Sequence, residues 1–98
     1  MPKYVMLSTL GPDGAARLRD SPRRLKEVNA ELEEMGVRVL SQYALLGQFD
    51  FLNILEAPDE VTMARVATSL AARGTLKTLT LTAIEVDTFI DALGEGVG

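Results

Sequence analysis

The spacing of apolar residues changes along the chain, and this spacing predicts the secondary structure. Apolar residues recur three or four positions apart in residues 22–35 and 59–73, which is typical of amphipathic helices. A single helical turn is expected over 15–20 and a short terminal helix over 86–93. Four segments that alternate apolar with polar residues, or that are rich in β-branched and aromatic residues, are predicted to be strands: 3–10, 37–46, 49–57 and 76–84.

Turn and capping residues mark the ends of these elements. Gly47-Gln48 lies between the second and third strands, and a glycine at the first central position suits a type II′ turn, so we expect an antiparallel hairpin there. Ser21 is expected to cap the first helix, with Pro22 in its first turn. Asp59 is expected to cap the second helix. Residues 11–14 are expected to form a loop.

The order of elements is β-α-β-β-α-β followed by a short helix. Two right-handed βαβ crossovers joined by a hairpin give the α+β ferredoxin-like fold, a four-stranded antiparallel sheet with two helices on one face. At 98 residues the chain is expected to be one domain, 1–98, with residues 94–98 frayed.

Alternation along the strands divides their residues into two sets. A uniformly aliphatic set is predicted to face the helices: Val5, Leu7, Leu40, Leu52, Ile54, Leu79 and Leu81. A mixed set of aromatic, hydroxyl and amide residues is predicted to form the open face: Tyr4, Met6, Ser8, Val39, Ser41, Tyr43, Phe49, Phe51, Asn53, Thr78, Thr80 and Thr82. An open face is normally polar and charged, and this one is not. We therefore expect a second copy of the sheet to cover it, or alternatively the chain's own tail, through Phe89 and Ile90, in a monomer.

The amino-acid composition argues against several classes of function. The hydrophobic fraction is 47%, which favours an oligomer for so small a chain, and the net charge of −4 without a basic patch argues against nucleic-acid binding. The absence of Cys and His removes thiolate chemistry, disulfides and the commonest general base. No metal or other cofactor is expected. No apolar run is long enough to span a membrane, so we expect a soluble cytoplasmic protein that does not bind membranes.

The chain resembles the GYD-domain family over nearly its whole length, residues 4–89. The segments that carry the resemblance are 20–25, 43–50, 55–60 and 75–80, followed by Phe89. The family's Gly-x-Tyr-Asp motif reads Gly47-Gln48-Phe49-Asp50 here, so that Phe replaces Tyr and removes a phenol. The resemblance implies a ferredoxin-like fold of the dimeric α/β-barrel type, and it supplies no established reaction.

Candidate site residues come from the hairpin and the mixed set. Asp50 is interpreted either as a carboxylate at a pocket mouth or, as we favour, as a cap for backbone N–H groups, because a lone Asp lacks the second group that acid–base catalysis needs. The residues expected to line a ligand cavity between two sheets, or to pack in their interface, are Ser41, Tyr43, Phe51, Asn53 and Thr80.

Two functions remain open at this point. We favour a module that associates with copies of itself or binds a small molecule, with no catalytic residues. The alternative is a small cofactorless enzyme, monooxygenase- or isomerase-like, that uses the inter-sheet cavity by analogy with other dimeric α/β-barrel proteins.

Overall fold

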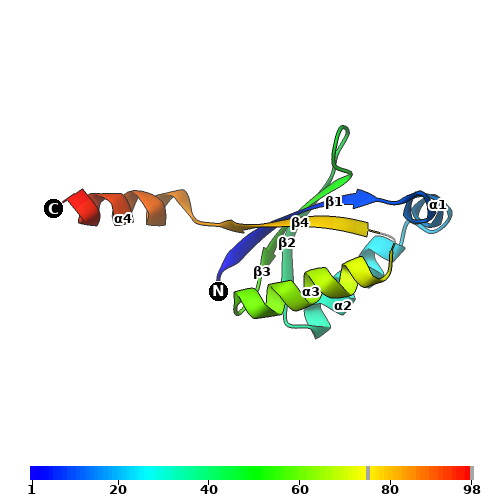
Figure 1. The fold of residues 1–98 in the computed structure, drawn as a ribbon, viewed down its shortest axis with the longest axis horizontal. Coiled ribbons are helices and arrows are strands. Elements are labelled where there is room, and N and C mark those ends of the chain that lie inside the picture. The colour runs from blue at the N-terminus through cyan, green and yellow to red at the C-terminus, as the bar shows by residue number, and fades with distance from the viewer. Residues whose placement is uncertain (75, 98) are drawn as a thin grey trace.

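One antiparallel sheet organises the chain, with the strand order β2-β3-β1-β4 (Figure 1). The structure is a computed structural model that describes residues 1–74 and 76–97. Its strands are β1 (Lys3–Leu10), β2 (Arg38–Ala44), β3 (Phe51–Glu56) and β4 (Leu76–Ala83). The central strand β1 pairs with β3 and β4, so that Val5 lies opposite both Ile54 and Leu81.

Helices α2 (Arg24–Glu34) and α3 (Glu60–Ala72) cover one face of this sheet (Figure 1). Helix α1 (Pro12–Asp20) follows β1 at the end of the sheet, and α4 (Val86–Val97) follows β4. The predicted α+β class and the ferredoxin-like arrangement are confirmed. The first crossover, however, contains two helices, where the sequence pattern predicted one helix preceded by a single helical turn.

The segment between β1 and α2 differs from the prediction. Residues 11–14 do not form a loop, because Pro12 opens α1, where its fixed φ and missing N–H are suited to the first helical turn. Asp13 in the first turn and the arginines in the last turn both complement the helix dipole. Ser21 ends α1, with its N–H donating to the carbonyl of Arg17, and it does not cap α2.

The hairpin between β2 and β3 is antiparallel, as predicted, but its connection is longer than two residues. The strands end at Ala44 and begin again at Phe51, and the Leu45 N–H donates to the Asp50 carbonyl at 2.7 Å. The Asp50 N–H donates to the Ser8 carbonyl of β1 at 2.8 Å. Residue 50 is therefore hydrogen-bonded to β1 as well as to Leu45 across the connection.

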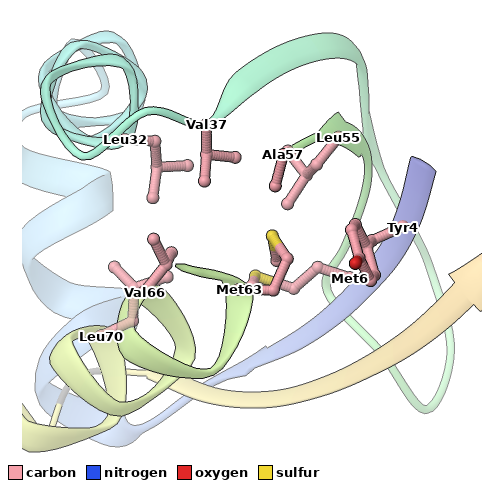
Figure 2. Packing of buried hydrophobic residues seen from close by; sticks show 9 residues of the cluster. All are labelled: Tyr4, Met6, Leu32, Val37, Leu55, Ala57, Met63, Val66 and Leu70. Carbon is pink, nitrogen blue, oxygen red and sulfur yellow. The ribbon is translucent and has the colours of Figure 1, made fainter. Parts of the chain in front are cut away.

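The core lies between the sheet and helices α2 and α3 (Figure 2). Its buried residues are Tyr4, Met6, Leu32, Val37, Leu55, Ala57, Met63, Val66 and Leu70. The capping of α3 by Asp59 is confirmed, since its Oδ1 accepts from the Thr62 N–H at 2.8 Å.

The assignment of sheet faces was wrong. None of the aliphatic residues predicted to face the helices is buried, whereas Tyr4, Met6 and Phe51 of the other set are. Alternation separates two sets but does not say which set the helices cover when both are apolar. Here the larger side chains fill the space beneath the helices. A register irregularity between Val39 and Ser41 adds a second cause, because it changes which β2 residues share a face with β3.

Helix α4 continues away from the body of the molecule beyond β4 (Figure 1), and the principal extents are 56 × 29 × 19 Å. Its apolar residues Val86, Phe89, Ile90 and Leu93 are 53–68% exposed. The tail therefore does not fold back over its own sheet, which was the alternative considered for a monomer. The helix extends through Val97, past the expected end at residue 93, and residue 98 of the segment expected to fray lies outside the described residues.

Candidate functional site

The open side of the sheet carries a continuous aliphatic surface. We call it the aliphatic face, and it consists of Val5, Leu7, Leu52, Ile54, Leu79 and Leu81. The pairing register places these side chains directly across from one another on three adjacent strands. Leu79 is 47% exposed and Leu81 48%. An exposed cluster of this kind marks an interaction surface.

The structure separates the predicted site residues into two groups. Ser41 and Tyr43 pair with Ile54 and Leu52, so they belong to the open side. Phe51, Asn53 and Thr80 face the helices. The inter-sheet cavity of the enzyme alternative required Tyr43 and Asn53 to point into one space, and they lie on opposite faces.

Asp50 has the structural arrangement that we favoured. Its Oδ2 accepts a hydrogen bond from the Leu10 N–H at 2.7 Å in a partly buried setting. The carboxylate therefore satisfies the last backbone donor of β1 and fastens the hairpin to that strand.

A cavity of about 90 Å³ lies between the inner face of the sheet and helices α1 and α2. Its sheet side includes two buried polar residues, Ser8 and Asn53. Asn29 of α2 and Gln42 of β2 also line it and form a reciprocal amide pair, with N···O distances of 3.0 and 3.4 Å. The guanidinium-bearing residues Arg17, Arg24 and Arg73 contribute to its lining as well.

A second, more open hollow of about 290 Å³ lies between α3 and the inner side of β1 and β4. Burial raises the pKa of the Tyr4 phenol, and the nearby Glu60 and Asp59 carboxylates raise it further. The phenol is therefore protonated at neutral pH, which suits a hydrogen-bonding group and not a base. Thr80 also lines this hollow, and its buried Oγ1 has no hydrogen-bond partner among the described residues.

The arrangement is suited to binding. In the part of the chain that the structure describes, no three His, Cys, Asp or Glu residues come together as a metal site. None of the described helices is long and apolar enough to cross a membrane. The residues that line the 90 Å³ cavity include the amide side chains of Asn29, Gln42 and Asn53, together with Ser8 and exposed arginines at its edge. Such side chains can orient a ligand through hydrogen bonds and charge.

Sequence reasoning missed the helical contribution to this cavity. Asn29 lies four positions after Leu25 and three before Leu32, so the sequence alone places this polar residue on the inward-facing stripe of α2. Its position there could have been used to predict a polar group facing the interior. Arg17 gave no such signal, because the helix that positions it was predicted only as a single turn.

Known proteins resemble this chain in sequence and in fold. The family model described as GYD domain matches residues 4–93. A Thermus thermophilus protein named glutamine synthetase and cystathionine beta-lyase binding protein is 53% identical over 94 residues, which cover 95% of this chain and 99% of that protein. The crystal structure of FFRP-DM1 has a TM-score of 0.61 at 16% identity, covering 86% of this chain and 100% of that chain. The crystal structure of TTHA0845, also from Thermus thermophilus, has a TM-score of 0.55 at 20% identity, covering 87% of this chain and 95% of that chain. The last two show the fold alone.

Proposed function

The chain belongs to the GYD domain family, and we propose that it is a small binding module that associates with itself through the aliphatic face of its sheet. The single observation that carries this proposal is the exposure of Leu79 and Leu81 beside four further aliphatic residues. The resemblance seen in the sequence is confirmed at the level of the family.

A second copy is the occupant that fits this surface best. Two sheets pack face to face about 10 Å apart with interdigitating apolar side chains, and the same aliphatic surface on two copies can meet about a two-fold axis. Sheet-to-sheet association stays a prediction, and the residues proposed for its interface are now those of the opposite set.

The size of the sheet indicates that α4 takes part. Four strands about 4.8 Å apart and about eight residues long present a face of roughly 500 Å². A standard interface takes about 800 Å² from each partner. Helix α4 of the same chain holds an exposed apolar stripe, Phe89, Ile90 and Leu93, at a distance from its own core (Figure 1). A dimer in which each α4 packs against the other subunit would bury both surfaces.

The test is a charge placed on the aliphatic face. Leu81→Asp is expected to convert the associated protein into a folded monomer, because a carboxylate would have to be buried against aliphatic side chains. Val61→Asp on α3, an equally drastic change at a side chain that is 78% exposed on the helix side, is the matched control. Analytical ultracentrifugation and circular dichroism measure mass and folding. A Leu81→Asp protein with unchanged mass, or a monomeric wild type, would contradict the proposal.

The module is further proposed to bind enzymes of amino-acid metabolism in the cytoplasm. Support comes from the Thermus relative, whose name states that it binds glutamine synthetase and cystathionine beta-lyase and which matches this chain almost end to end. Surface plasmon resonance with the purified glutamine synthetase and cystathionine beta-lyase of the source organism tests this part separately. Saturable binding of either enzyme is expected, and the absence of binding to both would refute it.

A further inference from the structure

The amide of Asn53 is the most informative polar group inside the molecule. The residue is 9% exposed, it lines the 90 Å³ cavity, and its Oδ1 has no hydrogen-bond partner among the described residues. Buried polar atoms in native proteins nearly always have a partner. The unpaired oxygen therefore indicates a molecule that enters the cavity and brings a hydrogen-bond donor.

The residues that line the cavity constrain the central part of the ligand. Apolar side chains from the sheet and from α2 surround the space, including Met6, Phe51, Val28 and Leu32. A cavity of about 90 Å³ is smaller than the ~150 Å³ apolar cavity that accommodates benzene. The apolar part of a ligand must therefore be short, such as a few methylene groups.

The arginines indicate an anionic end. Arg17, Arg24 and Arg73 all contribute to the lining, and they come from three different parts of the chain, in or directly after α1, α2 and α3. The Arg24 Nη1 lies 3.9 Å from the Glu27 Oε2, and Arg73 forms an ion pair with Glu31. All four side chains are exposed to solvent, where ion pairs are weak and readily exchanged for other partners. A planar guanidinium is well matched to a carboxylate, which it can bind with two hydrogen bonds.

We infer that this cavity holds the carboxamide end and the short methylene chain of a carboxylate, whose charged end lies at the cavity mouth against the exposed arginines. The Asn53 amide offers one acceptor and a donor group, which a ligand carboxamide can match with two reciprocal hydrogen bonds. The cavity already contains such a pair between Asn29 and Gln42. The carboxylate then faces the arginines, with Arg17 in the last turn of α1 as its principal partner.

This site goes beyond self-association and does not depend on it. The cavity is on the helix side of the sheet, and the aliphatic face is on the opposite side. The Leu81→Asp monomer is therefore expected to bind the same ligand as the wild type. Self-association is measured by the mass of the protein and ligand binding by the NMR titration, so the failure of one proposal can be distinguished from the failure of the other.

The experiment is an NMR titration of the full chain with glutaramate, the half-amide of glutaric acid. Glutaramate is expected to shift the side-chain amide of Asn53 and the methyl groups of Val28 and Leu32. Pentanoate lacks the amide and glutaramide lacks the carboxylate, so each is expected to bind about tenfold more weakly, the value of one net hydrogen bond or ion pair. Glutarate, which replaces the donor by a second anion, is expected to bind more weakly as well.

Two variants assign the ends of the ligand. Arg17→Gln is expected to weaken glutaramate binding about two- to fivefold, the range for an exposed ion pair. Arg19→Gln, on the same helix but outside the cavity, is the matched control and should leave the binding unchanged. Asn53→Leu is expected to abolish the preference for glutaramate over pentanoate. The comparison of ligands on the wild-type chain tests the same contact even where Asn53→Leu does not fold. Absence of cavity shifts with glutaramate, or equal binding of all four compounds, would overturn the inference.

Discussion

Gly47 and Asp50 have separate structural roles within the motif Gly47-Gln48-Phe49-Asp50. Gly47 has a φ of 129°, a conformation that residues with a Cβ rarely adopt. Asp50 binds β1 twice, through its carboxylate to the Leu10 N–H and through its own N–H to the Ser8 carbonyl. Neither contact uses the side chain of Phe49, so the motif can fasten the hairpin without the phenol that the family motif has at this position.

A substitution of Asp50 tests this structural role. Asp50→Ala is expected to lower the free energy of unfolding by about 1–3 kcal/mol, because it leaves the partly buried Leu10 N–H without its charged acceptor. Asp50→Asn retains an uncharged acceptor and should lose less. Urea denaturation measures the difference, with Asp91→Ala on exposed α4 as control. If Asp50→Ala is as stable as the control variant, Asp50 does not stabilise the attachment of the hairpin to β1.

At the scale of single elements, helix α3 follows its sequence most closely. Asp59 caps its first turn, and Met63, Val66 and Leu70 form the buried stripe that the spacing of apolar residues indicates. The strands follow their sequence less fully. In β1, Tyr4 and Met6 alternate with Val5 and Leu7, and both pairs are apolar. Alternation alone therefore could not assign the inner face.

The Asp59 cap predicts a pH dependence of stability. Hydrogen bonds from Thr62 lower the pKa of the Asp59 carboxyl below its ordinary value. A group with a lowered pKa in the folded state contributes stability that is complete above its unfolded pKa of about 3.9 and is lost as the pH falls through the folded pKa. Asp59→Asn cannot lose this contribution on acidification.

Urea midpoints measured on both proteins above about pH 5 and near pH 2 test this prediction. The wild type should be the more stable protein at the higher pH, and the gap between the two should narrow at the lower pH. A gap that is constant, or that widens on acidification, would contradict the assigned cap.

At the scale of the whole molecule, one side of the sheet is filled by the core and the other is not. Helices α2 and α3 cover the inner side, and α4 extends past the sheet with its apolar residues more than half exposed (Figure 1). The ion pair of Lys3 with Glu85 joins the start of this extension to β1. The described chain thus has one buried core and two uncovered apolar surfaces, as the proposed self-association requires.

Removal of α4 separates folding from association. A chain that ends at Glu85 keeps the ion pair with Lys3. The free energy of unfolding of its monomer should lie within about 0.5 kcal/mol of that of the full-length monomer, because none of the α4 side chains that the structure describes belongs to the core. Its self-association should be markedly weaker in sedimentation equilibrium. Phe89→Asp is the corresponding single substitution. Association as strong as that of the full chain would show that α4 plays no part in the interface.

The sequence by itself determined the order of the main elements, the ferredoxin-like class, the cap of α3 and the family, because these depend on local spacing, capping residues and short-range motifs. It also predicted an open face too apolar for water, but it assigned that face to the mixed set, whose β1 and β3 members the structure buries under the helices. Tertiary structure decided which face is open, since α2 and α3 pack over Tyr4, Met6 and Phe51 and leave the aliphatic face uncovered. It also decided the cavity, because Arg17, Asn29, Gln42 and Asn53 come from four elements that only the folded chain brings together.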